Sequence, residues 1–387
     1  MRVLHVITGL GVGGAELQLR LLLRHLPADC DVVTLTDAGA VARGIVADGT
    51  HVTDLGMAGN RDVAVLPRLA RIIRSGRYDA VHTHLYRACL YGRLAARAAG
   101  VRAVVATEHS LGDSQMEGRP LSAGVRALYL AGERLGRMTV AVSPAVGERL
   151  NRWGVPRRRI RVVPNGIDVD RFRYDPAARA RTRRQLGLAQ GTFVVGGVGR
   201  LTGGKRFDVL LHAAARLPTD VTVLLVGAGP EEPGLRALAR RLGLAERVRF
   251  AGEAAHEDGP DRGAGAGGAP GLPALLSAMD ALASPSPEEA FGLALVEGLA
   301  CGLPVLYASC PAVDDLPAEA RGAPAAYCPS DPDSFAQALH DLRGTIPPRR
   351  SAPPAAAQHY SITRSADRLM RVYASVVPGP TPEVKPR

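Results

Sequence analysis

Short apolar segments alternate with longer amphipathic segments along the chain. In the first half, strands are predicted where runs of small and branched apolar residues end in polar turns, at residues 3–8, 31–36, 52–55, 79–83, 103–108 and 139–142. Between these runs the apolar positions recur with the period of a helix, as in residues 15–26. The alternation predicts an α/β fold, with a parallel sheet between helices and ligands at the carboxyl ends of the strands.

A second alternating series begins at residues 193–199 and leads to a last helix predicted at residues 365–376. The chain has 387 residues, whereas single cores seldom grow beyond about 250–300 residues. Two domains of similar architecture are therefore expected.

The composition narrows the choice of partners. The net charge of +11 favours an anionic partner, such as a nucleotide, a phospholipid surface or a nucleic acid. Aromatic residues make up only 4% of the chain and no basic stretch is interleaved with them, which argues against nucleic acid. Five cysteines without a CxxC pair favour reduced thiols and a cytoplasmic location. No signal peptide or membrane-spanning run is evident.

The glycines after the first predicted strand suggest a phosphate site. Gly9, Gly11 and Gly14 formally satisfy GxGxxG, which by itself is a weak signal for a dinucleotide and leaves an NAD-dependent dehydrogenase as one alternative. The free amides at a helix start can also face the phosphates of other ligands.

Two glutamates eight positions apart mark a second candidate site. We expect Glu289 at a helix entrance, because prolines precede it, and Glu297 about two turns inside the helix. Eight helical residues span roughly 12 Å, which is more than the ~5–9.5 Å between paired glycosidase carboxylates. Between the glutamates, the amides near Gly292 and Leu293 favour an anion. Such a site suits an elongated ligand with a sugar, a diphosphate and a ribose.

The segment from Glu289 to Glu297 and the following Gly298-Leu299-Ala300-Cys301-Gly302-Leu303-Pro304-Val305 closely resemble the nucleotide-sugar site of the GT4 retaining glycosyltransferases. These enzymes have the GT-B fold, in which two Rossmann-like domains face each other across a cleft. Further elements carry the same resemblance: Gly13-Gly14-Ala15-Glu16, Gly199-Arg200-Leu201 with Lys205, and Val226-Gly227-Ala228-Gly229-Pro230-Glu231.

The resemblance implies roles for individual residues. His109 and Glu289 are the predicted catalytic residues, with Glu289 holding the hydroxyls of the donor hexose. The predicted donor-binding residues are Gly13, Gly14, Arg200, Lys205, Gly292, Leu293 and Glu297. Arg200 and Lys205 would bind the diphosphate, and Glu297 the ribose. Retention without a covalent enzyme intermediate is expected.

No metal or other cofactor is expected. Asp168-Val169-Asp170 formally matches a DxD metal motif, but it follows a Pro-Asn-Gly turn with no further carboxylates close by, which favours a surface turn. His82 and His84 end one predicted strand and face the same side. They lack a third ligand in sequence, so a structural or acceptor-facing role is preferred over a metal site.

The resemblance also gives the predicted domain bounds. Residues 1–170 form the acceptor-side domain, 171–190 cross to the donor-binding domain at 191–355, and 356–377 return to the first domain. A Gly-rich insertion is predicted at 253–271 and a disordered tail at 378–387.

The acceptor is the least determined part of the prediction. An Arg- and Ala-rich chain without an anchor resembles the glycosyltransferases of aminoglycoside antibiotic biosynthesis, which implies a small aminocyclitol acceptor. A lipid-linked or cell-envelope acceptor is the alternative, and the basic stretch 126–137 would favour peripheral membrane contact. A nucleotide-sugar epimerase and a non-catalytic sugar-nucleotide-binding protein are alternatives of other classes. Cys310 and Pro311 stand where the family usually has glycines, which leaves the donor sugar open.

Overall fold

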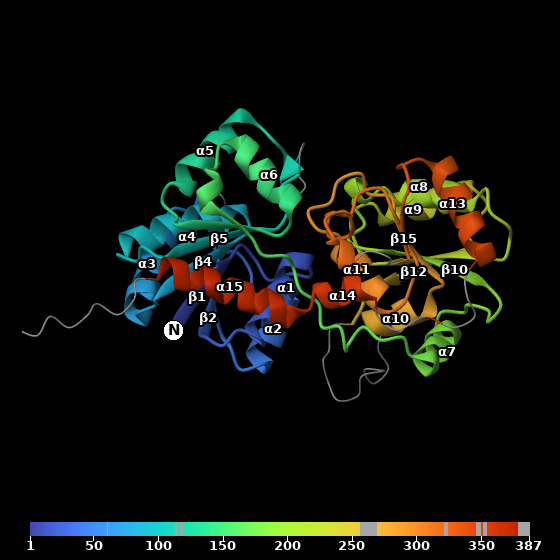
Figure 1. The fold of residues 1–387 in the computed structure, drawn as a ribbon, viewed down its shortest axis with the longest axis horizontal. Helices are drawn as coiled ribbons and strands as arrows, with labels where there is room; N and C mark the ends of the chain where they lie inside the picture. The colour runs from blue at the N-terminus through green and yellow to red at the C-terminus, as the bar shows by residue number, and fades with distance from the viewer. Residues whose placement is uncertain are drawn as a thin grey trace, which may run out of the picture. The chain divides into compact units, whose positions relative to one another are not determined.

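The computed structural model describes residues 1–59, 61–112, 115–116, 119–255, 269–320, 324–345, 350 and 354–377. The chain divides into two compact units (Figure 1). The first unit comprises Met1–Gly166 with the segment from Ile362 onward, and the second comprises Ile167–Ser361. Most of the predicted insertion, residues 256–268, and the predicted tail lie outside the described residues.

The first unit contains a parallel seven-stranded sheet of order β3-β2-β1-β4-β5-β8-β9. Its strands are β1 (Arg2–Ile7), β2 (Asp29–Thr34), β3 (His51–Asp54), β4 (Ala80–His84), β5 (Val104–Glu108), β8 (Met138–Ala141) and β9 (Ile160–Val162). The helices are α1 (Gly14–Leu23), α2 (Gly39–Ala47), α3 (Val65–Gly76), α4 (Tyr86–Ala98), α5 (Ala123–Glu133), α6 (Pro144–Trp153) and α15 (Ile362–Val376). A short antiparallel pair, β6 (Gln115–Met116) and β7 (Arg119–Pro120), follows β5.

Helices cover both faces of this sheet, as the alternating pattern predicts. Val3 and Leu4 are adjacent on β1 and fully buried, yet they belong to different apolar clusters. Val3 packs with Leu22 of α1 and Leu369 of α15, whereas Leu4 packs with Ile73 of α3. The period of two along a strand explains this division between the faces.

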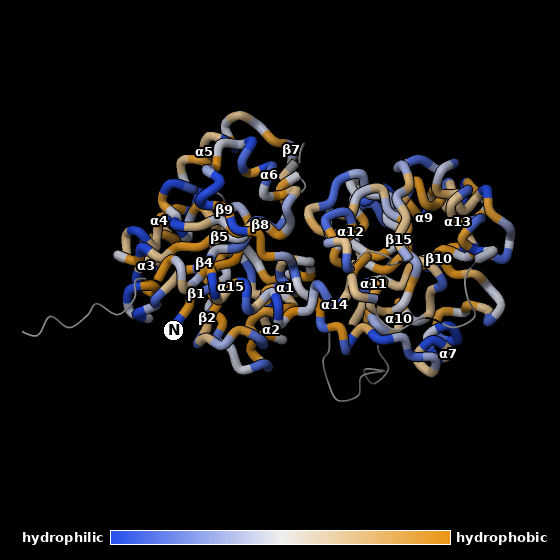
Figure 2. Tube along the Cα trace, viewed as in Figure 1, coloured by the Kyte–Doolittle hydropathy of each residue, from blue (hydrophilic) through white to orange (hydrophobic). Residues whose placement is uncertain are grey.

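The second unit contains a parallel six-stranded sheet of order β12-β11-β10-β13-β14-β15. Its strands are β10 (Phe193–Val198), β11 (Val221–Val226), β12 (Val248–Gly252), β13 (Ala281–Ser284), β14 (Val305–Tyr307) and β15 (Ala325–Tyr327). The helices are α7 (Pro176–Gln185), α8 (Phe207–Ala214), α9 (Glu232–Arg241), α10 (Leu272–Ala278), α11 (Leu293–Ala300), α12 (Pro311–Asp314), α13 (Pro332–Thr345) and α14 (Ala355–His359). The strands in the middle of the sheet consist mainly of hydrophobic residues, whereas α7 is hydrophilic (Figure 2).

Several element bounds differ from the sequence expectations by a few residues, and three cases follow. The helix expected to begin at Glu289 begins at Leu293, because Gly292 takes a left-handed conformation with φ of +94°. The weakly patterned segment 171–190 contains a helix, α7, which Asp175 caps by accepting hydrogen bonds from two amides of its first turn. The final helix begins at Ile362 rather than at 365.

Each sheet reverses its strand order at one point. In the first unit the reversal lies between β1 and β4, and in the second between β10 and β13. Loops that leave adjacent strands in opposite directions at such a point open a crevice where α/β proteins bind ligands. In the second unit these loops are residues 199–206 and 285–292, which contain three of the seven predicted donor-binding residues, Arg200, Lys205 and Gly292.

Candidate functional site

The loop after β10 is held by close backbone packing. Gly199 has φ of +148°, and a Cβ on Gly227 would lie 2.0 Å from the carbonyl oxygen of Gly199. The Leu201 amide donates to the Ala228 carbonyl at 2.9 Å. The loops after β10 and β11 are therefore in direct contact, which is possible only with a glycine at position 227. This contact fixes the start of the segment that carries Arg200 and Lys205.

Lys205 forms an ion pair with Glu289. The Lys205 Nζ lies 2.5 Å from Glu289 Oε1, and the two side chains are 30% and 14% exposed. The pair joins the two loops at the strand reversal, because β10 and β13 are neighbours in the sheet. Arg200 is exposed, and its side chain has no polar partner among the described residues. The loop after β10 thus offers one free guanidinium and one ammonium that a carboxylate already holds.

The start of α11 is shaped by Gly292 and Cys310. A Cβ on Gly292 would lie 2.5 Å from Cys310 Sγ, in addition to the strain of the positive φ. The Ala312 amide donates to the Phe291 carbonyl at 2.9 Å. Cys310 and Ala312 therefore pack on the turn before α11, where Leu293 begins the helix.

Glu297 lies on α11, in an environment that disfavours its charge. The side chain is half-buried, and loss of water around the carboxyl group raises its pKa to about 8, although the nearby Arg171 acts in the opposite direction. In the ligand-free protein Glu297 is thus mostly protonated at neutral pH. A ligand whose hydroxyls donate to the carboxylate would stabilise the ionised form.

The remaining predicted site residues, Gly13, Gly14 and His109, belong to the first unit. Gly13 caps α1 with an extended backbone, and a Cβ there would lie 2.4 Å from Glu16 Oε2. Gly14 is exposed and is the first residue of the helix. The Leu17 amide donates to the Gly13 carbonyl at 3.0 Å. The loop that ends at Gly13 follows β1, at the strand reversal of this sheet, and α1 begins at Gly14.

His109 follows β5 and is linked to a histidine of the neighbouring strand. Its Nε2 lies 3.1 Å from Nδ1 of His84, and burial lowers the pKa of His109 to about 4. The Nε2 of His84 lies 3.0 Å from Nδ1 of His5, a residue that no sequence motif marks as functional. The expectation that His82 and His84 face the same side is confirmed, because both contact His5.

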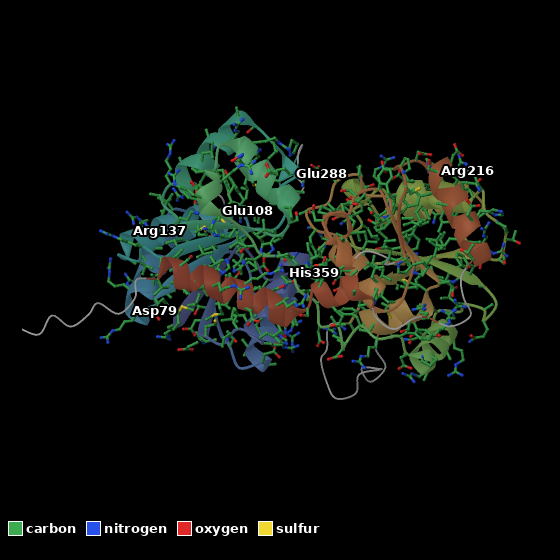
Figure 3. The ribbon with its side chains drawn as sticks, in the orientation of Figure 1. Asp79, Glu108, Arg137, Arg216, Glu288 and His359 are labelled. Atoms are coloured by element: carbon green, nitrogen blue, oxygen red, sulfur yellow. The ribbon has the colours of Figure 1, made fainter. Side chains whose placement is uncertain are left out.

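Glu108 points away from this cluster. It is 2% exposed and accepts a hydrogen bond from the Tyr129 hydroxyl at 2.9 Å. In Figure 3 it lies inside the first unit, beneath the helices α5 and α6. The alternation along β5 thus separates a structural carboxylate from the neighbouring His109.

The DxD match forms a local turn. Asp168 Oδ1 accepts from the amides of Asp170 and Arg171 at 3.1 and 3.2 Å, and Asp170 pairs with Arg173. Asp170 is exposed and Val169 is buried, as in an ordinary turn at a unit boundary. This arrangement agrees with the surface reading of the motif.

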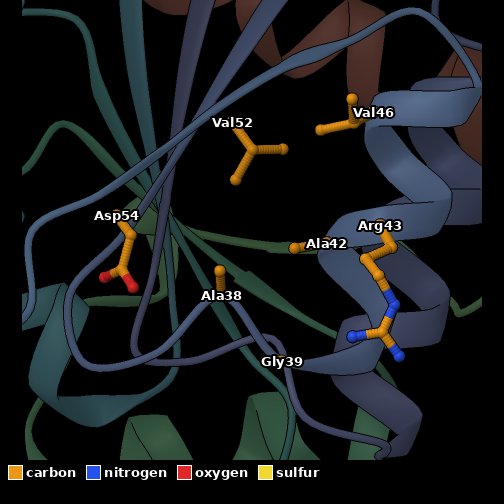
Figure 4. Close-up of a pocket in the computed structure, with 7 residues that line it drawn as sticks. All are labelled: Ala38, Gly39, Ala42, Arg43, Val46, Val52 and Asp54. Carbon is orange, nitrogen blue, oxygen red and sulfur yellow. The ribbon is translucent and has the colours of Figure 1, made fainter.

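A hollow lies between α2 and β3 of the first unit. Its volume is about 510 Å³, and its lining residues are Ala38, Gly39, Ala42, Arg43, Val46, Val52 and Asp54 (Figure 4). Mostly apolar and small side chains line it, and none of the predicted site residues does so.

In the described part of the chain, no helix is both long and apolar enough to cross a membrane.

Two family models match the chain. The model of Glycosyltransferase Family 4 matches residues 12–171, and the model of Glycosyl transferases group 1 matches residues 192–344. Among curated proteins, the D-inositol 3-phosphate glycosyltransferase of Mycobacterium tuberculosis (strain H37Ra) is 32% identical over 374 residues, which cover 90% of this chain and 73% of the relative. The protein of the same name from Salinispora tropica is 31% identical, and the match covers 80% of this chain and 66% of that relative. The chain thus spans about two thirds of the length of these relatives.

Solved structures share the fold. The HepE protein of Anabaena in complex with UDP-glucose has a TM-score of 0.81 at 23% identity, with 97% of this chain and 100% of that chain covered. The UDP-GlcNAc 2-epimerase of Methanocaldococcus jannaschii has a TM-score of 0.61 at 12% identity, with 97% and 100% covered. These comparisons confirm the predicted two-domain GT-B fold.

Proposed function

Because the chain belongs to glycosyltransferase family 4, we propose that it transfers a hexose or amino-hexose from a nucleotide diphosphate sugar, preferably a UDP sugar, to a hydroxyl of a small aminocyclitol. The observation that carries the donor half is the placement of Lys205 and Glu289 at the strand reversal of the second unit. Anabaena HepE, which has the same fold, has been crystallised with UDP-glucose.

The donor would lie along the loops that end β10 and β13. Arg200 provides a planar fork of donors and Lys205 a point charge, and both suit a diphosphate whose negative charge grows as it leaves. Glu297 would accept hydrogen bonds from the ribose, and Glu289 from the hexose. Binding of the diphosphate would draw Lys205 toward the phosphates and free the Glu289 carboxylate for the sugar.

The reaction would proceed with retention. No residue of the site stands out as a covalent nucleophile, so the leaving phosphate is proposed to take the acceptor proton on the same face of the sugar. Gly13, Gly14 and His109 would contact the transferred sugar, and the two cationic side chains would replace a metal ion at the diphosphate.

The acceptor is proposed from the curated relatives. Their name gives D-inositol 3-phosphate as the substrate, which is a ring of hydroxyls with one anionic group. An aminocyclitol has the same ring scaffold with cationic substituents. A lipid-linked acceptor is the second candidate, because α5 exposes both Leu128, which is 53% exposed, and Arg126.

A product screen tests the proposal. The purified protein is incubated with UDP-, GDP- and dTDP-sugars and with aminocyclitol, D-inositol 3-phosphate or polyprenyl phosphate, and masses are measured. A gain of one hexose or amino-hexose on the aminocyclitol, without detergent, is the expected result. A gain only on polyprenyl phosphate would replace the acceptor, and isomerised donor without acceptor would identify an epimerase.

A further inference from the structure

A strip of polar side chains crosses the otherwise apolar face of the first sheet that α1 and α15 cover. His5 on β1 and His82 and His84 on β4 are all at most 1% exposed. His5 and His82 are register partners of the parallel pair, which places them side by side. Burial of three imidazoles in a core is costly unless each nitrogen is hydrogen-bonded.

His5, His84 and His109 form a continuous chain of hydrogen-bonded imidazoles. His5 Nδ1 lies 3.0 Å from His84 Nε2, and His84 Nδ1 lies 3.1 Å from His109 Nε2. Burial lowers the pKa of all three imidazoles, to about 3 for His5 and about 4 for His109. Each ring is therefore neutral near pH 7 and has one N–H donor and one bare nitrogen.

Only two proton arrangements satisfy both links of the chain. If His84 carries its proton on Nε2, it donates to His5 and accepts from His109, whose Nδ1 is then bare. If His84 carries its proton on Nδ1, it donates to His109 and accepts from His5, and His109 then presents an Nδ1–H. The tautomers of the three residues are thus coupled.

The closed end of the chain favours the second arrangement, on the condition that an acceptor at the open end takes the Nδ1–H that this arrangement leaves on His109. His5 Nε2 is buried and has no partner among the described residues. In the first arrangement this nitrogen would carry an unpaired N–H, whereas in the second it is only an unused acceptor. Buried donors without a partner are rarer in proteins than unused acceptors, because they cost more free energy.

The open end of the chain meets a small cavity that both polar and apolar side chains line. His109 Nδ1 is buried, and the described residues provide no partner for it. His109 and Gln18 both line a cavity of about 20 Å³, and both amide atoms of Gln18 are likewise buried without a described partner. This space holds about one water-sized group. An oxygen there would accept from His109 and pair with the Gln18 amide.

We propose that His5 and His84 are positioning residues that fix His109 in its Nδ1–H tautomer, so that it acts as a neutral hydrogen-bond donor to an oxygen in this cavity. In the enzyme this oxygen would be a hydroxyl of the bound sugar or the water that the hydroxyl displaces. Only this last step rests on the proposed function, through the placement of His109 at the sugar. The tautomer itself is a property of the ligand-free protein.

A metal ion is the competing use of the same histidines. Ligand nitrogens of His5, His82 and His84 all lie within 4.8 Å of one another. However, His82 Nδ1 lies 2.6 Å from the Tyr373 hydroxyl and His82 Nε2 lies 2.7 Å from Thr107 Oγ1. Both nitrogens of His82 are thus already hydrogen-bonded, and an ion would have to break these contacts and the link between His5 and His84.

The direct test is NMR of the full-length protein labelled with ¹⁵N-histidine, because nitrogen shifts distinguish the two tautomers. The expected result is an Nδ1–H on His5, His84 and His109, without titration between pH 6 and 8. An Nε2–H on His109 in the wild-type protein would overturn the proposal. So would stoichiometric binding of added Zn²⁺ that shifts the signals of His5, His82 and His84.

Two variants separate the hydrogen bond from the volume of the side chain. In His84→Asn the amide NH₂ replaces the Nδ1–H donor, so His109 is expected to keep its tautomer. In His84→Leu the donor is lost, and the signals of His109 are expected to show a mixture of tautomers. The exposed His340 of α13 provides an internal reference that neither variant shifts. Retention of a single Nδ1–H tautomer in a folded His84→Leu protein would contradict the role of His84.

Activity then tests the link to sugar transfer. His84→Leu is expected to lower kcat by about ten- to a hundredfold at unchanged thermal stability of the second unit. His84→Asn is expected to recover most of that loss. If the tautomer changes in His84→Leu while transfer is unaffected, the positioning of His109 stands and the proposed contact of His109 with the sugar is wrong.

Discussion

Lys205 and Glu289 form a half-buried ion pair, with 2.5 Å between Nζ and Oε1, across the loops that end β10 and β13. The resemblance assigns these residues to different parts of the donor, the diphosphate and the hexose. Their pairing means that the ligand-free site is close to neutral at this point. If the donor binds here as proposed, it would replace the partner that each of these two residues has in the ligand-free protein.

The first prediction concerns this pair. Lys205→Met is expected to lower kcat by about a hundredfold, because the cation that stabilises the leaving diphosphate is lost. Glu289→Gln is expected to raise the KM for the donor.

In urea unfolding of both single variants and the double variant, a coupling free energy of about 1 kcal/mol is expected for a partly exposed pair. Arg236→Met, which breaks an exposed pair on α9, is the control and is expected to leave kinetics unchanged. Near-wild-type kinetics in Lys205→Met would remove the proposed diphosphate site.

The second prediction follows from the pKa of about 8 at Glu297. If ribose hydroxyls donate to the carboxylate, donor binding requires its ionised form. The affinity for UDP-glucose, which has no group that titrates in this range, is expected to rise up to tenfold per unit as pH increases from 6.5 to 8, and to level off above 8. Calorimetry in buffers of different ionisation enthalpy should detect proton release on binding at pH 7.

Glu297→Gln is the matched variant for this titration. It is expected to bind UDP-glucose more weakly at pH 9 and without the pH dependence, and Glu297→Ala is expected to raise the donor KM strongly. The folded chain also holds this proton more tightly than the unfolded chain, whose carboxyl group titrates near the ordinary value of 4.5. The free energy of unfolding therefore falls as pH rises from about 4.5 to about 8, and Glu297→Gln should reduce this decline. Identical pH profiles for wild type and variant would contradict the shifted pKa.

The third prediction concerns Gly292. In Gly292→Ala the added methyl group would meet Cys310 Sγ, and the residue would keep a positive φ. A loss of about 1–3 kcal/mol in the free energy of unfolding is expected. The control is Gly344→Ala in α13, where a Cβ meets nothing within 4 Å and a stable or slightly stabilised protein is expected. The double variant Gly292→Ala with Cys310→Ala should recover only the part of the loss that comes from the steric contact.

The fourth prediction distinguishes two arginines on α7. Arg183 is fully buried and donates to Asp280 at 2.6 Å, together with Arg179, whereas Arg181 is half-exposed. Arg183→Leu is expected to cost about 3–5 kcal/mol of the free energy of unfolding, because it leaves a partly buried carboxylate with one partner fewer. Arg181→Leu is expected to change it by less than about 0.5 kcal/mol. Equal, small losses in thermal or urea unfolding would show that Asp280 does not depend on Arg183.

The seven strands for which bounds were predicted were recognisable because their apolar runs are bounded by turns, and their observed bounds lie within two residues of the predicted ones. The late start of α11 was not predictable in the same way. Proline indicated a helix near Glu289, but α11 begins only after the left-handed Gly292, which packs against Cys310, eighteen residues further along the chain.

The contacts within the candidate site depend on which strands are neighbours. The pairing of Lys205 with Glu289 requires that β10 lies beside β13, and the link from His5 to His84 requires that β1 lies beside β4. A periodic pattern reports the face of a residue but not the order of the strands. The sequence therefore indicated that His82 and His84 share a face and gave no indication that His5 joins them. The excess of arginine is likewise evident from the sequence, whereas the burial of Arg183 is not.

The five cysteines form no disulfide, and burial raises the pKa of the thiols of Cys30, Cys301, Cys310 and Cys328, while Cys89 is fully buried. Because the thiolate is the reactive species, the native chain should react with maleimides at neutral pH almost as slowly as a cysteine-free protein. One engineered surface thiol in each unit can then be labelled without removing any natural residue. The distance between two such labels, with and without UDP-glucose, would show whether the two units move relative to each other in solution.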